Sequence, residues 1–281
     1  MDERDAGPVP GRLIGAGRSA DVYDAGNGRV LRRYRDGRPA AWVAKEAEVM
    51  KHARAHGVPV PEVFDVSGPD IVMARAAGPT MVDVLIRRPW TVGAQARLLA
   101  RLHDQVHAVP ALDWLPTPFG DGAESGAAWD GGARDGGAGG DGAAGDEGHG
   151  EDAAPGGAVL LHRDLHPMNV ILTADGPQII DWEGAARGPA VADVAMTWVI
   201  VSFSQVPVPR LEAAASRTVQ AMFTRAFLRA AGPLDQRWRQ AAVRHRLGDP
   251  HLLPAERARL ERLVRQGRGG RAATAGSGAE R

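Results

Sequence analysis

The feature that most constrains this chain is the stretch between residues 160 and 181, where short apolar runs alternate with polar loops. A first run, Leu160–Leu161, enters a loop that carries Asp164 and, five positions later, Asn169. A second run leaves that loop, the chain turns, and a third run ends on Asp181. Short apolar runs bounded by turn residues are typical of buried strands. The pattern therefore predicts a hairpin that brings Asp164, Asn169 and Asp181 to one end.

These three side chains suit one kind of chemistry. The oxygens of Asp181 and Asn169 are hard ligands of the type that Mg²⁺ prefers, with water and phosphate oxygens completing the shell. Asp164, placed near such an ion, accepts the proton of an attacking hydroxyl group. Positioning phosphates, neutralising their charge and orienting an acceptor are the requirements of phosphoryl transfer.

The residues themselves resemble a known family. Residues 162–169 read His-Arg-Asp-Leu-His-Pro-Met-Asn, and residues 179–182 read Ile-Ile-Asp-Trp. The first segment resembles a kinase catalytic loop. The two together look like the aminoglycoside phosphotransferase family of small-molecule kinases, which have a protein-kinase-like fold. The resemblance also implies that Asp193, at the start of the next helix, braces the loop backbone.

Less specific interpretations of these residues remain. An Asp in a loop is often only a turn residue, although the complete spacing argues against that here. Two nearby histidines, His162 and His166, could be zinc ligands, but no further His or Cys stands at ligand spacing. His103 and His107 share one face of an expected helix, and we interpret them as packing or surface residues.

A glycine-rich segment near the start allows two interpretations. Gly15 and Gly17, followed by Ala20, match a dinucleotide fingerprint, which must open a helix. Instead, apolar pairs flank an Asn-Gly turn at 27–28, which predicts a β-hairpin. A hairpin favours a flap whose backbone N–H groups cover nucleotide phosphates, with Ser19 at its tip.

The strand after this flap carries a departure from the family pattern. In kinase-like folds this strand has a Lys that binds phosphates and pairs with a helix Glu. Arg32 holds that place, which keeps the charge but not the shape. Glu46 and Glu48 compete as its partner. Glu46 lies four residues before Met50 and so shares its face, and the resemblance also favours it, whereas the alternative is a solvated surface Glu.

The resemblance places the purine between the lobes. There, the backbone of Ala74 and Ala76 offers hydrogen-bonding groups to the adenine edge. Met73 lines the purine pocket, although a Met on a strand is more often plain core.

The fold class predicted is α+β, a two-lobed protein-kinase-like fold with a β-rich N-lobe and a mostly helical C-lobe. We expect an N-terminal nucleotide-binding lobe over 1–77 and a catalytic lobe over 78–266. Residues 120–157 hold 15 of the 36 glycines and nine acidic residues, too polar to offset chain entropy, which predicts a disordered insertion. A disordered tail is expected over 267–281.

Composition narrows the partners. Lys and Arg number 34, as do Asp and Glu, so no bulk charge favours nucleic acid or an anionic membrane. The longest apolar stretch, Val194–Val206, is shorter than the ~20 residues that span a bilayer. No Cys is present, which excludes disulfides and thiol catalysis. A cytoplasmic location without a signal peptide is the expectation.

The sequence therefore predicts a small-molecule kinase that uses Mg²⁺ and ATP, or another nucleoside triphosphate, to phosphorylate a hydroxylated acceptor. Fifteen Arg against six acidic residues over 210–281 argue against a polycationic aminoglycoside as the acceptor. The alternative is a non-catalytic nucleotide-binding regulator, since the usual Lys is missing. A protein kinase is disfavoured, because Asp-Phe-Gly and Ala-Pro-Glu are lacking.

Overall fold

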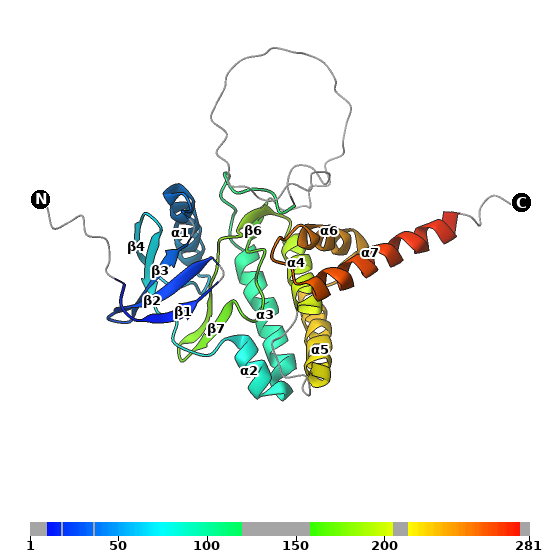
Figure 1. Cartoon of the computed structure of the whole chain (residues 1–281), viewed down its shortest axis with the longest axis horizontal. Helices are drawn as coiled ribbons and strands as arrows, with labels where there is room; N and C mark the ends of the chain where they lie inside the picture. Colours follow the sequence, from blue (N-terminus) through cyan, green and yellow to red (C-terminus); the bar gives the residue numbers. More distant parts are fainter. Residues whose placement is uncertain (1–9, 18, 36, 120–157, 205–212, 276–281) are drawn as a thin grey trace, which may run out of the picture.

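The computed structural model describes residues 10–17, 19–35, 37–119, 158–204 and 213–275, without side chains at 213–215 and 266–275. Figure 1 shows a strand-rich part beside a mostly helical part, which is the predicted two-lobed α+β arrangement. We call residues 13–74 the N-lobe and residues 81–275 the C-lobe. The domain boundary expected at residue 77 falls in the connection between them.

The N-lobe is a five-stranded antiparallel sheet with one helix. The strands, in the spatial order β1-β2-β3-β5-β4, are β1 (Leu13–Ala16), β2 (Ala20–Gly26), β3 (Arg29–Tyr34), β4 (Val63–Ser67) and β5 (Asp70–Ala74). Helix α1 (Ala40–Ala55) buries Val43, Ala47 and Met50, which helical spacing places on one face toward the core. Glu46 and Met50 both lie on this helix and are both buried, as the expected pairing of Glu46 with Arg32 requires.

The predicted hairpin is also confirmed, and it rejects the dinucleotide-fold reading. Strands β2 and β3 pair antiparallel, with Tyr23 opposite Leu31. Asn27 and Gly28 connect them with φ angles of 50° and 71°. A two-residue loop with positive φ at both positions matches the right-handed twist of its strands, and Asn-Gly is the pair that tolerates it best.

The chain enters the C-lobe by a close backbone approach. A Cβ atom on Gly78 would lie 2.1 Å from the carbonyl oxygen of Leu172, so only glycine fits there. Thr80 then caps α2 (Met81–Arg87) in a reciprocal capping box with Asp83. The single turn η1 (Pro89–Thr91) leads into α3 (Val92–His107).

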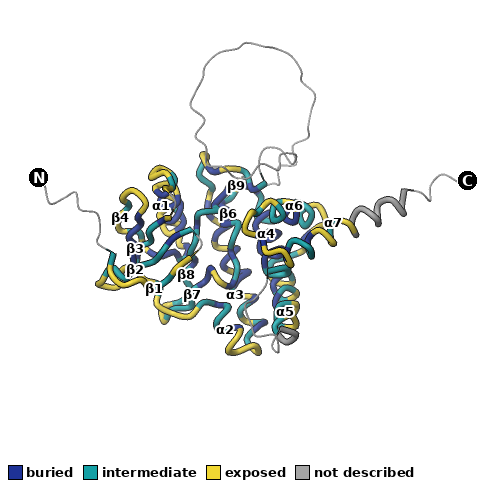
Figure 2. Tube along the Cα trace, in the orientation of Figure 1, coloured by how far each residue is buried: buried dark blue, intermediate teal, exposed yellow. Residues whose placement is uncertain are grey.

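Four further helices complete the C-lobe: α4 (Ala190–Phe203), α5 (Ala213–Ala231), α6 (Gln236–Leu247) and α7 (Pro254–Ala275). Helix α4 is buried along most of its length, because α3, α5, α6 and α7 all contact it. Figure 2 shows the buried segments in the interior of both lobes and exposed segments on the outside of α1 and α5. None of the described helices is long and apolar enough to cross a lipid bilayer.

Two segments of the chain, residues 120–157 and 267–281, are expected from the sequence to be disordered. Helix α7 continues to Ala275 and so overlaps the segment 267–281, for which a disordered tail stays a prediction. Once a helix is nucleated, each added residue gains a hydrogen bond, and the preceding turns carry the helix through a glycine-containing segment. The insertion expected over 120–157 lies outside the described residues, as do residues 276–281.

The stretch 160–181 forms two small sheets rather than one hairpin. Strands β7 (Val170–Thr173) and β8 (Gly176–Ile179) make the predicted reversal. The first apolar run, however, becomes β6 (Val159–Leu161) and pairs with β9 (Ala186–Gly188), beyond Asp181. The loop before the hairpin therefore connects β6 to β7, and the loop after it connects β8 to β9. Each of these strands is paired, so both ends of each loop are fixed.

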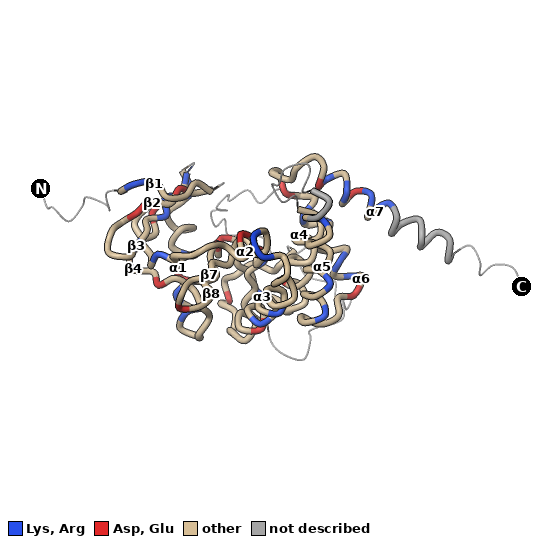
Figure 3. The backbone as a smooth tube through the Cα atoms, turned by 90° about the horizontal axis from the view of Figure 1, so that it is seen from below, with Lys and Arg blue, Asp and Glu red and all other residues tan. Residues whose placement is uncertain are grey.

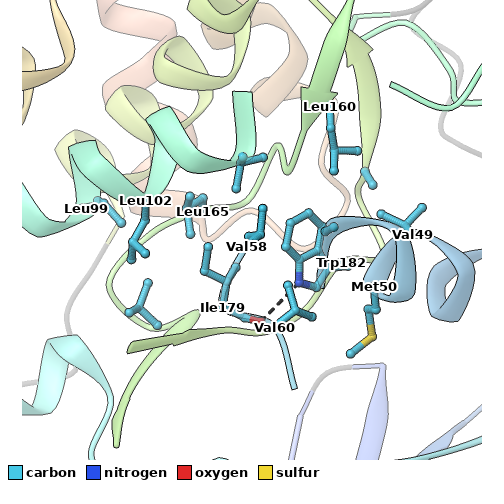
Figure 4. Close-up of a cluster of buried hydrophobic side chains, with 14 of the residues drawn as sticks. Val49, Met50, Val58, Val60, Leu99, Leu102, Leu160, Leu165, Ile179 and Trp182 are labelled. Carbon is cyan, nitrogen blue, oxygen red and sulfur yellow. Dashed lines mark hydrogen bonds between the residues drawn. The ribbon is translucent and has the colours of Figure 1, made fainter. Parts of the chain in front are cut away.

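A continuous core lies beneath these loops. Figure 4 shows Trp182 surrounded by apolar side chains from both lobes, with its indole N–H donating to the carbonyl of Ile179 at 3.2 Å. Trp182 is 1% exposed. The side chains labelled around it come from α1, the segment before β4, α3 and the stretch 160–179: Val49, Met50, Val58, Val60, Leu99, Leu102, Leu160, Leu165 and Ile179. The loop residues near Trp182 therefore stand on rigid packing.

Candidate active site

The loop of residues 162–169 is anchored by Asp193, which is fully buried at the start of α4. Its carboxylate accepts the N–H groups of His162 at 3.1 Å and Arg163 at 2.6 Å. Arg163 has a φ of 66°, which costs a non-glycine residue about 1 kcal/mol or more. The two charge-assisted bonds offset that strain. The loop is therefore held in a shape that its own backbone preferences do not favour.

Two histidines of α3 complete the anchor. The Nε2 atom of His107 lies 3.1 Å from Asp193, and the Nδ1 atom of His103 lies 3.5 Å from it. Burial by itself raises the pKa of the Asp193 carboxyl, but the nearby imidazoles outweigh burial and hold that pKa well below its usual value. These histidines contact the anchor inside the fold, as the packing interpretation expected.

Asn169 is oriented by Asp164. Its amide nitrogen donates to the backbone carbonyl of Asp164 at 2.9 Å and to its carboxylate at 3.0 Å. Both donors of the amide are therefore directed toward Asp164, and the Asn169 oxygen has no hydrogen-bond partner among the described residues. The loop presents one amide oxygen and one carboxylate side by side.

His166 fixes the Asp164 carboxylate from the other side. The N–H of Met168 donates to Nδ1 of His166 at 3.2 Å, so the ring proton lies on Nε2, 3.4 Å from Asp164. Partial burial raises the pKa of Asp164, but the charge and hydrogen bond of His166 outweigh it, with help from His162 and Arg246, and the pKa falls below its usual value. The Asp164 side chain is still 42% exposed, so an acceptor can reach it.

Arg32 connects the N-lobe to the segment after β8. Its guanidinium lies 2.9 Å from Glu46 of α1 and 2.6 Å from Asp181. Glu46 is 1% exposed and also accepts the hydroxyl of Tyr34. Burial lowers the pKa of Arg32, but the charges of Glu46 and Asp181 outweigh it, so the pKa is raised and the guanidinium stays charged. Glu48, the competing candidate, is exposed and instead accepts the Trp114 indole N–H at 3.4 Å.

Asp181 has a φ of 70°, a backbone conformation rare for residues other than glycine. The ring of His162 donates from Nε2 to the carbonyl of the preceding residue, Ile180, at 3.1 Å. The 162–169 loop and the Asp181 segment are thus joined through one imidazole. Strained residues held this firmly are typical of functional sites.

All three predicted groups line one cleft between the lobes, with a volume of about 2700 Å³. Its walls include β1–β3, residues 73–78, residues 163–171 and 180–185, α4–α6, and residues 248–256. Pockets for one small ligand hold roughly 300–1,000 Å³. The cleft is therefore large enough for a nucleotide and a second molecule.

The flap residues lie over this cleft, but two of their polar groups form hydrogen bonds within the protein. The N–H of Gly17 donates to the carbonyl of Ala20 at 2.8 Å, and the hydroxyl of Ser19 donates to Glu183 at 3.1 Å. Gly15 lines the cleft without crowding, since a Cβ there would meet only Val22, at 3.8 Å. In this state the Gly17 N–H and the Ser19 hydroxyl are engaged within the protein.

The expected purine-binding segment is partly committed to the sheet. The N–H of Ala74 donates to the carbonyl of Glu62 at 2.8 Å, so this group is used within the fold. The expectation that backbone groups of Ala74 and Ala76 contact adenine stays a prediction. The N–H of Ala76 has no hydrogen-bond partner in the described chain. Met73 is 6% exposed and still lines the cleft, so it belongs both to the core and to the pocket.

Glu183 is a site residue that the sequence reasoning did not select. It lies 3.3 Å from Arg38 and 3.9 Å from Arg32, besides its bond to Ser19. Burial and the charge of Asp181 raise its pKa, against the pull of the two arginines. The signal available in the sequence was its closeness to Asp181, which lies two residues earlier.

The donor set fits a hard divalent cation. Asp181 uses one carboxylate oxygen for Arg32, and the other has no hydrogen-bond partner among the described residues. The Asn169 amide oxygen is likewise available. Carboxylate and amide oxygens, without a soft ligand, match Mg²⁺. The arrangement offers two metal ligands, one exposed proton acceptor and one guanidinium at a single cleft.

Comparison with known proteins gives the following matches. The model of the phosphotransferase enzyme family matches residues 10–244. None of the curated proteins compared with this chain matches it significantly.

Several solved structures share the fold. The apo form of a thermostable mutant of the aminoglycoside phosphotransferase APH(4)-Ia is 18% identical, with a TM-score of 0.55, and the match covers 91% of this chain and 94% of that chain. A choline/ethanolamine kinase family protein from Mesorhizobium loti is 17% identical, with a TM-score of 0.54 and coverage of 94% and 91%. A ternary complex of a further APH(4)-Ia mutant with ADP and hygromycin B is 17% identical, with a TM-score of 0.56 and coverage of 91% and 93%.

Proposed function

We propose that this chain, which belongs to the phosphotransferase enzyme family, transfers the γ-phosphoryl group of ATP to a hydroxyl group of a small molecule. The observation that carries the proposal is the meeting of Asp164, Asn169, Asp181 and Arg32 at one cleft. The structural neighbour that holds ADP and hygromycin B supports a nucleotide and a hydroxylated acceptor as the two ligands.

Asp164 acts on the acceptor. Its lowered pKa keeps the carboxylate ionised at neutral pH, and its exposure to the cleft allows a hydroxyl group to approach. The acceptor oxygen forms a bond to the γ-phosphorus, the bond from that phosphorus to the bridging oxygen breaks, and ADP leaves. The hydroxyl proton passes to Asp164. Asn169 and His166 hold the carboxylate in the orientation that this step needs.

Arg32, Asn169 and Asp181 act on the nucleotide. Asn169 and Asp181 would hold Mg²⁺, which neutralises phosphate charge during transfer. Arg32 is braced by Glu46 and presents a forked cation that can bind two phosphate oxygens. Ser19, Arg38 and Glu183 hold the flap against the C-lobe segment after Asp181.

The test is an acceptor screen with labelled ATP and Mg²⁺, in which Asp164→Asn is compared with wild type. Loss of the proton acceptor is expected to lower kcat by roughly 10²–10⁴. The matched control is Asp175→Asn, an exposed carboxylate in the turn between β7 and β8, whose rate should stay at the wild-type level. Equal rates in wild type and Asp164→Asn would remove Asp164 from its role.

One observation favours a second function, that of a nucleotide-binding regulator without turnover. Arg32 replaces the usual Lys and already occupies one oxygen of Asp181 at 2.6 Å. A guanidinium that keeps this bond would compete with the metal. Thermal stabilisation by ATP and Mg²⁺, without Asp164-dependent transfer to any acceptor in the screen, would favour this alternative.

A further inference from the structure

The side chain of Arg163 is a partly buried cation without an acidic partner in the described chain. Within the part of the chain that the structure describes, no carboxylate lies within 4 Å of its guanidinium, and its Nε atom is buried without a hydrogen-bond partner. Burial lowers the pKa of Arg163, against the more distant charges of Asp193 and Asp164. Keeping a charge in such a place is costly unless a partner is supplied.

Among the described residues, this guanidinium makes one hydrogen bond, and its partner is a neutral group. An Nη2 hydrogen of Arg163 is directed at the Nε2 atom of His245 on α6. Burial and the charges of Arg163 and Arg246 lower the pKa of His245 to about 4, so this imidazole is uncharged at neutral pH. His245 orients the guanidinium through a hydrogen bond and leaves its charge uncompensated.

The charged side chains that line the cleft around Arg163 balance in number, so what matters is which of them are already paired. The C-lobe side of the cleft, which we call the acceptor wall, contains three arginines and two carboxylates besides Asp164. The acceptor wall comprises Arg163, Arg244, His245, Arg246, Asp249 and Glu256.

Both carboxylates of the acceptor wall are already engaged. Asp249 lies 2.9 Å from Arg246, and Glu256 lies 3.8 Å from it. Arg244 is exposed and has no ion-pair partner in the described chain. Figure 3 shows Lys and Arg positions spread along α5, α6 and α7, on the side of the molecule that provides this wall. Apart from Asp164, a polycation would meet only paired carboxylates on this wall, whereas an anion would meet two guanidinium groups without an ion-pair partner in the described chain.

From this arrangement, and resting on the proposed kinase function, we infer that the acceptor carries an anionic group, a carboxylate or a phosphate, that pairs with Arg163. Arg163 directly precedes Asp164, so a bound anion would hold the neighbouring hydroxyl of the same molecule toward the proton acceptor. The substrate class is thus a hydroxy acid or a phosphorylated polyol, bound by a forked cation suited to two-oxygen contacts.

The first experiment measures anion binding directly by calorimetry, with the nucleotide site saturated by ADP and Mg²⁺. The probes are inorganic phosphate and glycerate. Wild type is expected to bind at least one of them, and Arg163→Met to bind it about tenfold to a hundredfold more weakly. Arg163→Lys keeps the charge but loses the fork, and should fall between the two.

The control variant is Arg262→Met, which removes an exposed arginine of α7 outside the cleft and should bind like wild type. Thermal unfolding of each variant verifies that it is folded. No binding of either probe to wild type, or equal binding to Arg163→Met, would overturn the inference.

The second experiment compares matched acceptors by turnover with wild type alone. One set is glycerate, glyceramide and 3-amino-1,2-propanediol, and the other is glucose 6-phosphate, glucose and glucosamine. Where a set is phosphorylated, kcat/KM is expected to be at least about tenfold higher for its anionic member. The two sets separate a carboxylate from a phosphate.

The outcomes separate this inference from the proposed function. Asp164-dependent transfer that prefers neutral or cationic members overturns the anionic acceptor and leaves the kinase in place. Arg163-dependent anion binding without Asp164-dependent transfer to any acceptor retains the anion site and removes the kinase.

Discussion

On the N-lobe side of the cleft, Arg32 lies between two carboxylates, Glu46 at 2.9 Å and Asp181 at 2.6 Å, whereas on the C-lobe side Arg163 faces only a neutral imidazole. Both side chains are at least partly withdrawn from water, with Arg32 12% exposed and Arg163 half-buried, so burial alone does not explain the difference between them. They differ in whether the charge is compensated. Arg32 belongs to an ion network with Glu46 and Asp181, whereas the charge of Arg163 has no carboxylate partner among the described residues.

This difference matches the two ligands that the cleft is proposed to hold. A nucleotide arrives with a metal ion that neutralises part of its charge, and the groups that receive it can be organised in advance by internal ion pairs. Acceptors differ from one enzyme to another, so the acceptor site must be selective. An unpaired cation in that site favours an anion over neutral or positively charged molecules. Three measurements of stability test this difference between Arg32 and Arg163. The largest effect is expected on the N-lobe side.

The largest effect is expected from Arg32→Met. This change leaves Glu46 buried without its cation, and removing one partner of a buried pair typically costs about 3–5 kcal/mol. The free energy of unfolding, measured in urea, should fall by about that amount. Arg12→Met, which removes an exposed arginine, should change it by less than about 0.5 kcal/mol.

The variant Arg32→Lys tests whether a positive charge at this position is enough to restore the stability. Its ammonium can still reach one carboxylate, and most of the stability should return. A loss under about 1 kcal/mol in Arg32→Met would mean that the network on the N-lobe side contributes little.

An intermediate effect is expected from pH. The pKa of His245 is lowered to about 4 in the folded protein, so the unfolded chain binds the proton more readily. Stability from this group is complete above pH ~6.5 and is lost as the pH falls toward 4. Between pH 7.5 and 4.5, wild type should lose up to about 2 kcal/mol more than His245→Gln. Parallel stability curves for the two proteins would contradict this.

The smallest effect is expected from Arg163→Met. Replacing a partly buried charge that has no carboxylate partner with an apolar side chain is often neutral or stabilising. The unfolding free energy should stay within about 1 kcal/mol of wild type, or rise. A loss above about 3 kcal/mol would show that Arg163 is compensated within the fold, and it would weaken the case for an external anion.

The family pattern in 162–182 was sufficient to predict the β7–β8 reversal and the α+β fold, and to place Asp164, Asn169 and Asp181 at one cleft. It worked because these residues are close in sequence, and loop and strand geometry over some twenty residues is a local property. The pairing of Arg32 with Glu46 was also accessible, since one helical face restricts the choice to residues that point inward.

Other features were decided only by tertiary structure. The pairing of β6 with β9, the contact of Ser19 with Glu183, and the isolation of the Arg163 guanidinium each depend on segments far apart in the chain. No local pattern reports whether a given charge meets a counter-ion once the chain is packed, because that depends on which side chains arrive from other elements and on how much water they exclude. The sequence by itself determined the chemical groups of the proposed reaction centre, and packing determined which charges along the cleft are paired within the fold and which are not.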